Sequence, residues 1–140
     1  MTAALLVVDT NVVVAGLLTR EPRAPTARIL DSMLGGSLRF LLSEALLAEY
    51  RAVLLRPAIA RAHGLAPAEV DEILIRLAAN AVIRAPTTGA SGPAGDLHLF
   101  DLLATAPTAL LVSGDAKVLR HAGARGRTPR SFLGGSERLG

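Results

Sequence analysis

The sequence contains no cysteine and no tryptophan, and its only aromatic residues are one tyrosine and three phenylalanines. The absence of cysteine excludes disulfide bonds and thiolate metal sites, and with it we expect a cytoplasmic protein. Because aromatic side chains are scarce, the core has to be built from Leu, Val, Ile and Ala. The same scarcity disfavours recognition of a nucleic-acid sequence by aromatic stacking.

Long apolar runs are also missing. No segment reaches the roughly 18 apolar residues of a membrane span, so no membrane partner is expected. The apolar first twenty residues lack a basic leading segment and are interrupted by Asp9 and Asn11, which argues against a secretory signal. A Gly-rich nucleotide fingerprint is absent as well, which disfavours a dinucleotide- or ATP-dependent enzyme.

The length of 140 residues fits one domain. We expect this domain to cover residues 1–133, followed by a frayed tail over 134–140. Continuous apolar runs over 5–8 and 109–112 are typical of strands buried on both faces of a parallel sheet. Weaker strands are expected over 39–42, 81–84 and about 123–127, and helices over about 11–18, 24–34, 43–55, 67–79, 97–105, 115–121 and 129–133. This alternation predicts an α/β fold with three α/β/α layers and a central, mostly parallel sheet of about five strands.

Acidic residues follow the two strongest predicted strands. Asp9 comes directly after the first apolar run, and Asp115 comes shortly after the second. Because ligands bind beyond the carboxyl ends of parallel strands, both carboxylates would face the same edge of the sheet. Either residue alone is equally well explained as a helix N-cap, and it is their common position that favours a functional site.

Two further acids have positions that need an explanation. Glu49 lies at the edge of the apolar stripe of its predicted helix, where a carboxylate is costly unless it is paired with a cation or a metal. The alternatives are a buried ion pair with an Arg or a side chain that reaches solvent. Asp96 precedes a helix, and by itself would be interpreted as an N-cap. Asp101 is rotated well away from Asp96 on that helix, which favours an exposed carboxylate over a spare ligand.

Several carboxylates at one place repel one another and are tolerated when a hard divalent cation lies among them. Mg²⁺ prefers oxygen ligands, keeps part of its water shell and bridges readily to phosphate. A set of acids with no Cys and no paired His argues against Zn²⁺. Asp9, Glu49, Asp96 and Asp115 are therefore the candidate metal ligands and catalytic residues.

Four segments together resemble motifs of the PIN-domain family, in particular the toxin components of bacterial toxin–antitoxin pairs. These segments, in chain order, are Val8-Asp-Thr-Asn-Val12, Ser43-Glu-Ala-Leu-Leu-Ala-Glu-Tyr50, Gly95-Asp-Leu-His-Leu-Phe-Asp101 and Val112-Ser-Gly-Asp115. The segment from Thr128 to Leu133 is similar to the closing strand-to-helix step of the family. Each motif alone is weak, but the four in this order are fairly specific.

The resemblance implies a PIN-like fold and cleavage of RNA that depends on Mg²⁺ or Mn²⁺. The four acids would hold one or two ions, and Asn11 and Ser113 would support them by hydrogen bonds. Many relatives carry further acids just before the third motif, where this chain has Gly92, Ala94 and Gly95, so a second ion has fewer ligands here. The resemblance also implies a homodimer and a neutralising protein antitoxin.

Basic residues supply candidate contacts to RNA. The formal charge is +3, and if a cation neutralises the four acids, fifteen Lys and Arg oppose eight acids, which gives +7 and suits a polyanion. A basic run follows the fourth acid and contains Lys117, Arg120, Arg125, Arg127 and Arg130. It either steers phosphates or forms a solvated surface. His98 is a further possible RNA contact, although a lone His is more often a surface or capping residue.

Two other functions remain open at this point. The first is a non-catalytic PIN-like interaction module, against which the presence of all four acids counts. The second is a phosphatase with Asp9 as its nucleophile, but such a motif needs an Asp where this chain has Asn11. Trapping a phosphorylated Asp9 would support the phosphatase, and an intact fold that binds no metal would support the interaction module.

Overall fold

The strands of the computed structural model are short and parallel. The structure describes residues 4–139, with side chains up to Gly134. A three-stranded sheet has the order β1-β4-β5, and β2 pairs with β3 in a second sheet. All five strands lie within segments predicted to be strands; they are β1 (Leu6–Val8), β2 (Leu41–Leu42), β3 (Val82–Ile83), β4 (Leu110–Val112) and β5 (Gly126–Arg127).

The prediction of one sheet of about five strands is wrong, because the strands form two sheets joined by one bridge between Leu6 and Phe40. The amide of Leu6 donates to the carbonyl of Arg39 at 3.1 Å. Strand β2 ends after two residues because Ser43 follows as the N-cap of the next helix. The three-layer arrangement stays a prediction.

Seven helices correspond to predicted ones, namely α1 (Thr10–Leu18), α2 (Pro25–Gly35), α3 (Glu44–Leu54), α5 (Pro67–Asn80), α6 (Leu97–Leu103), α7 (Ala116–Ala122) and α8 (Pro129–Leu139). A further helix, α4 (Pro57–His63), and a 3₁₀ turn over Gly123–Arg125 were not predicted. The signals for α4 were present in the sequence, since Pro57 starts it and Gly64 ends it with φ of +69°. Helix α8 takes in residues 134–139, which we expected to be frayed, and Gly140 lies outside the described residues.

The core is aliphatic, as the composition predicts. Every residue of β1 is fully buried, and the buried side chains of α2, α3 and α5 are Ala, Leu, Ile, Val and Met, with Tyr50 as the one exception. The two largest fully buried side chains are Phe40 and Tyr50. Burial and the nearby carboxylates raise the pKa of Tyr50 far above its usual range, so its hydroxyl stays protonated and donates to the carbonyl of Val8. This bond ties α3 to the end of β1.

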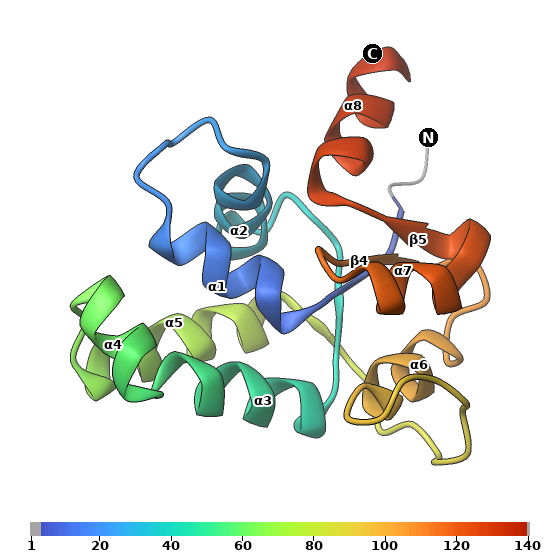
Figure 1. Cartoon of the computed structure of the whole chain (residues 1–140), viewed down its shortest axis with the longest axis horizontal. Helices are drawn as coiled ribbons and strands as arrows, with labels where there is room; N and C mark the ends of the chain where they lie inside the picture. The colour runs from blue at the N-terminus through green and yellow to red at the C-terminus, as the bar shows by residue number, and fades with distance from the viewer. Residues whose placement is uncertain (1–3, 140) are drawn as a thin grey trace.

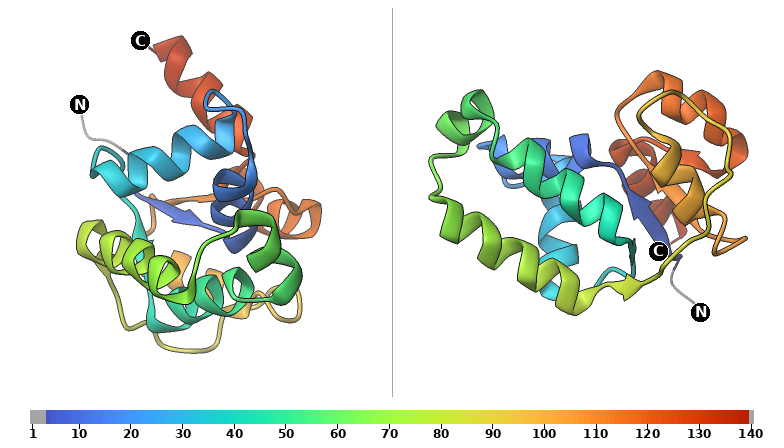
Figure 2. Two further views of the ribbon diagram at one scale, coloured as in Figure 1. Left: turned by 90° about the vertical axis from the view of Figure 1, so that its left-hand side faces the viewer. Right: turned by 90° about the horizontal axis from the view of Figure 1, so that it is seen from below.

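Helices α3, α4 and α5 gather at one end of the molecule and α6 and α7 at the other, with β1 between them (Figure 1; Figure 2, right). Val8 in β1 lies opposite Val112 in β4 in parallel register, so these two strands end side by side. Arg125 fixes the segment between α6 and β4, because its guanidinium donates to the carbonyls of Leu103, Ala106 and Ala109. Among residues 4–139, no helix is both long enough and apolar enough to cross a membrane.

Candidate metal centre

Asp9 lies at the carboxyl end of β1 and is the N-cap of α1, with only 5% of its surface exposed. The amide of Thr10 donates to its Oδ1 at 2.8 Å, and Ser113 Oγ and Asn11 Nδ2 donate to its Oδ2 at 2.7 and 3.1 Å. Burial raises the pKa of Asp9, and the charges of Asp96 and Glu49 raise it further, against the effect of these hydrogen bonds. The N-cap interpretation is therefore right, but it does not account for the charge.

Ser113 and Asn11 join the two strand ends. The hydroxyl of Ser113, which is fully buried, donates to Asp9 and accepts from the amide of Asp115 at 2.9 Å. Asn11 Oδ1 accepts from the amide of Gly114 at 3.0 Å, and its Nδ2 lies 3.4 Å from Ser113 Oγ. These bonds hold the loop after β4 against the start of α1, so the position of Asp115 depends on that of Asp9.

Glu49 projects from α3 toward the same edge and is half-buried. The hydroxyl of Thr10 donates to its Oε2 in a short hydrogen bond, and His98 Nε2 lies 3.4 Å from its Oε1. The partners of this carboxylate are a hydroxyl and an imidazole, and the described residues provide no Arg partner for it. Its side chain is 31% exposed, so the alternative of a side chain that reaches solvent holds in part. Neither partner had been predicted, because nothing in the sequence links α3 to Thr10 or to α6.

Asp96 and Asp115 approach from α6 and α7. Asp115 caps α7, since its Oδ1 accepts from the amide of Lys117 at 2.8 Å. Asp96 occupies the N-cap position of α6 but makes no capping hydrogen bond. Burial raises the pKa of Asp96, and the charges of Asp115 and Glu49 add to this effect while His98 opposes it. The interpretation of Asp96 as an ordinary N-cap, which the sequence favoured for this residue alone, does not hold.

Two of the four acids, Asp9 and Asp96, have pKa values raised in part by the charges of other acids of the set. Asp9 is affected by Asp96 and Glu49, and Asp96 by Asp115 and Glu49. Their ligand atoms are all carboxylate oxygens, which is the chemistry that Mg²⁺ and Mn²⁺ prefer, so the residues fit such an ion. In the part of the chain that the structure describes, no three acidic or imidazole side chains are arranged as a ready metal site. Coordination by all four acids stays a prediction.

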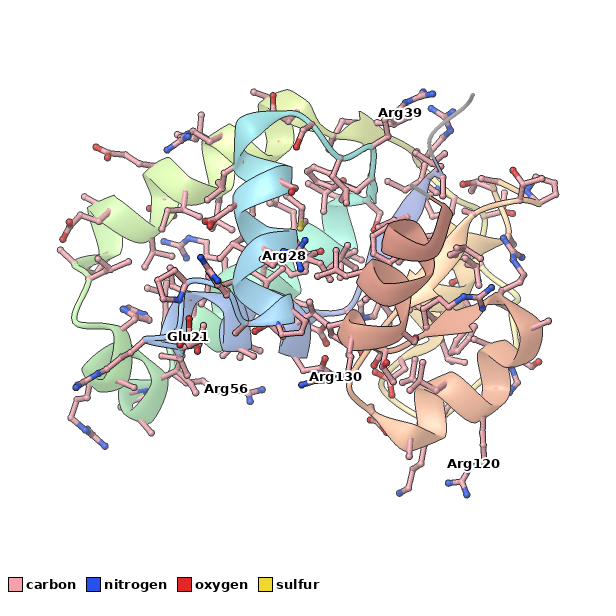
Figure 3. All side chains as sticks on the ribbon, turned by 90° about the horizontal axis from the view of Figure 1, so that it is seen from above. Glu21, Arg28, Arg39, Arg56, Arg120 and Arg130 are labelled. Atoms are coloured by element: carbon pink, nitrogen blue, oxygen red, sulfur yellow. The ribbon has the colours of Figure 1, made fainter. Side chains whose placement is uncertain are left out.

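The basic run after the fourth acid divides into two groups. Arg125 binds three backbone carbonyls, and Arg127 donates to the carbonyls of Ala124 and Gly126, so both serve the fold. Lys117, Arg120 and Arg130 are exposed. Figure 3 shows Arg120, Arg130 and Arg56 on one side of the molecule, the side on which α1 begins, and Arg39 on the opposite side.

Asp101 has a structural role that the sequence did not suggest. It is half-buried on α6, and its Oδ1 accepts from the amide of Ala90 at 2.9 Å. The loop before α6 is also held by Phe100, because a Cβ on Gly92 would lie 2.7 Å from the Phe100 ring. Asp101 thus anchors the loop that leads to Asp96. The expectation that Asp101 is an exposed carboxylate is therefore wrong, because the residue is half-buried and hydrogen-bonded.

A groove is bordered by His98. It has a volume of about 490 Å³ and is formed by the end of β2 and the first turn of α3, by the chain that leaves β3, and by α6. Figures 1 and 2 show these three segments close together. Most of the groove surface is apolar, and among its polar residues are His98, Asp101 and Arg84. No motif pointed to it, because its walls come from three separate stretches of the chain.

One comparison with known proteins produced a match. A family model described as PIN domain matches residues 5–117. The matched segment contains all four acids together with Asn11 and Ser113. No curated protein matches the chain.

Proposed function

The chain belongs to the PIN-domain family, whose members are generally nucleases, and we propose that it is a metal-dependent endoribonuclease acting as the toxin of a toxin–antitoxin pair. The observation that supports this proposal is that Asp9, buried at the end of β1, is joined through the hydroxyl of Ser113 to the amide of Asp115 at the end of β4. The charges of Asp96 and Glu49 act on Asp9 as well. Carboxylates that repel one another destabilise a fold unless a cation offsets the repulsion.

The proposed ligands of Mg²⁺ or Mn²⁺ are Asp9, Glu49, Asp96 and Asp115, with one or two ions bound. A divalent cation at such a site supplies Lewis acidity, which makes water a nucleophile near neutral pH and offsets charge on the scissile phosphate. The protein contributes orientation. Ser113 and Asn11 fix the carboxylate of Asp9, while Thr10 and His98 fix that of Glu49.

Phosphate contacts are proposed for Lys117 and Arg120, which are exposed on the helix that Asp115 caps. They lie close in sequence to an acid that would hold the cation, so they can attract the backbone of an RNA strand toward it. His98 is the third proposed contact to RNA. We further propose that the protein is cytoplasmic, that it forms a homodimer and that a protein antitoxin neutralises it.

The test is cleavage of mixed RNA by the purified protein with and without Mn²⁺. The Asp9→Asn variant keeps an oxygen for the amide of Thr10 but loses the charge, so its Mn²⁺-dependent cleavage should fall by about a hundredfold or more, as when a central electrostatic group is removed. Asp31→Asn is the matched control, because it removes the same charge from an exposed position on α2. Equal cleavage by the wild type and by Asp9→Asn would refute the proposal.

The same preparations separate the other two functions. A phosphorylated Asp9 trapped with a phosphate ester would indicate the phosphatase instead. Both oxygens of Asp9 already accept hydrogen bonds, which does not favour a nucleophile. An intact protein that takes up no Mn²⁺ in calorimetry and cleaves no RNA would indicate the interaction module.

A further inference from the structure

The groove between α3, α6 and the chain after β3 exposes apolar surface next to the acidic edge. Its floor includes Ile83, which is 57% exposed and is one of three large hydrophobic side chains exposed in the described part of the chain. Its volume of about 490 Å³ lies within the range of roughly 300–1,000 Å³ that is usual for small-ligand sites. Exposed apolar surface of this kind costs free energy in water, so an occupant that covers it would be favoured.

Three residues that line the groove have polar atoms with few or no partners. His98 Nδ1 is the one buried side-chain nitrogen or oxygen in the described residues that has no hydrogen-bond partner. Asp101 uses Oδ1 to accept from Ala90, and no bond engages its Oδ2. The guanidinium of Arg84 is exposed and makes only a 3.3 Å bond to the neighbouring carbonyl of Ile83. The occupant should therefore have a flat apolar body and an edge of donors and acceptors.

His98 also connects the groove with the acidic residues. It lines the groove, and its Nε2 lies 3.4 Å from Oε1 of Glu49. Whatever fills the groove is thus separated from a proposed metal ligand by a single imidazole ring. In an RNA strand, the group next to the cleaved phosphate that combines an apolar face with a polar edge is the base.

We propose that this groove is a subsite for an unpaired base of the RNA strand, beside the phosphate that is cleaved. The inference rests on the proposed nuclease function and names the part of the substrate that the nuclease recognises. The base lies on Ile83 and against the guanidinium of Arg84, since arginine planes stack on bases in the absence of aromatic side chains. Its polar edge donates to Asp101, whose Oδ1 alone is engaged by Ala90. A base within a duplex cannot enter, so the substrate is single-stranded at this point.

The chain supplies its own control for this proposal. The dipeptide Ile83-Arg84 lines the groove, and the same dipeptide occurs as Ile75-Arg76 on the exposed face of α5, where Ile75 is 68% exposed. Replacing either pair removes the same atoms from an exposed surface. Only the first replacement changes the groove.

The first experiment measures binding without cleavage. Protein with ¹³C-labelled isoleucine methyl groups is titrated with each of the four nucleoside monophosphates and, separately, with ribose 5-phosphate. The methyl signal of Ile83 should shift with at least one nucleotide and stay in place with ribose 5-phosphate, while the signal of Ile75 stays in place throughout. In Arg84→Ala, the dissociation constant of that nucleotide should rise about tenfold, and in Arg76→Ala it should not change.

The second experiment measures recognition during cleavage. A pool of short RNAs with random sequence is cut in Mn²⁺, and the new ends are sequenced. The wild type should prefer one base at a fixed position beside the cut, by about tenfold, and Ile83→Ala should lose this preference while Ile75→Ala keeps it. An abasic ribose at that position should slow the wild type about tenfold and Ile83→Ala hardly at all.

The two experiments separate the subsite from the nuclease. An Ile83 methyl signal that ignores all four nucleotides at millimolar concentration overturns the subsite, and so does a base preference that Ile83→Ala retains. A shift of that signal in a protein that cleaves no RNA supports a base site and overturns the nuclease. Cleavage without the shift leaves the nuclease intact and assigns the groove to another occupant, such as an apolar segment of a partner protein.

Discussion

Two helix starts in this protein do the same structural work with different side chains. Asp9 follows β1 and caps α1, and Ser43 follows β2 and caps α3. The hydroxyl of Ser43 is neutral and accepts from the amide of Leu46 at 3.1 Å. Both residues are buried, with 5% and 3% of their surfaces exposed. Neutral and ionised acceptors cap helices about equally well. The charge of Asp9 is therefore not explained by capping.

The electrostatic surroundings of Asp9 and Ser43 also differ. Burial and the charges of Asp96 and Glu49 raise the pKa of Asp9, so ionising this carboxyl group in the folded protein has a free-energy cost. The neutral cap at Ser43 has no such cost. A buried ionisable group that helix capping does not require is a sign of function. The comparison with Ser43 separates the capping role of Asp9 from this second role.

The largest expected effect comes from supplying the missing cation. Protein freed of metal with EDTA should gain stability when Mn²⁺ is added, by about 2.7 kcal/mol at a concentration one hundred times the dissociation constant, because the ion offsets the repulsion among the acids. In Asp9→Asn most of this gain should disappear, since one ligand charge is gone. The measurement is the unfolding temperature over a series of Mn²⁺ concentrations.

Asp31→Asn is again the control and should gain as much stability as the wild type. If Mn²⁺ stabilises Asp9→Asn and the wild type equally, the cation binds elsewhere. The contrast between the two caps would then have no functional meaning.

A smaller effect is expected from pH in the metal-free protein. The pKa of Asp9 is raised in the folded state, so the folded protein binds this proton more tightly than the unfolded chain does. Stability should accordingly fall as the pH rises from about 4, the ordinary carboxyl value, through the raised pKa, by at most about 1.4 kcal/mol per pH unit for one proton. Asp96, whose pKa is also raised, adds to this fall.

In Asp9→Asn the fall of stability with pH should be shallower, with the part due to Asp96 remaining. Urea unfolding at a series of pH values in EDTA measures it, and the same series on a Ser43→Ala variant provides the contrast, because Ser43 carries no proton that titrates in this range. A fall as steep in Asp9→Asn as in the wild type would mean that Asp9 is not the destabilised charge.

The elements of the fold could be predicted largely from local pattern. The buried strands are continuous apolar runs, and Ser43, Pro67 and Pro129 mark the helix starts that the structure shows. The split of the sheet could not be predicted, because it depends on how β1 and β2 lie relative to each other in space, which no local pattern encodes. The short helix α4 was missed although Pro57 and Gly64 bracket it, since its seven residues show little apolar periodicity.

Only the part of the candidate site that follows from chain order and strand direction could be predicted from the sequence. Parallel strands place Asp9 and Asp115 at one edge, and the position of Glu49 on its helix turns it inward. The bonds of Glu49 with Thr10 and His98 arise from packing between separate elements, which no local pattern encodes. The roles of Arg125 and Asp101 were hidden for the same reason, because each binds backbone groups far away in the sequence.

The smallest expected effect is that of removing the neutral cap. Ser43→Ala deletes the hydroxyl that accepts from the amide of Leu46, and loss of such a cap costs about 1 kcal/mol. Urea unfolding with and without Mn²⁺ measures both quantities that matter here. The variant should be less stable by about that amount in both conditions, while the gain from Mn²⁺ stays equal to that of the wild type. Asp9→Asn should keep the capping hydrogen bond from the amide of Thr10 but lose most of the stability that Mn²⁺ adds. If Mn²⁺ also fails to stabilise Ser43→Ala, then binding of the cation depends on the packing of α3 as a whole. The carboxylate of Asp9 would then not be a specific ligand of the cation.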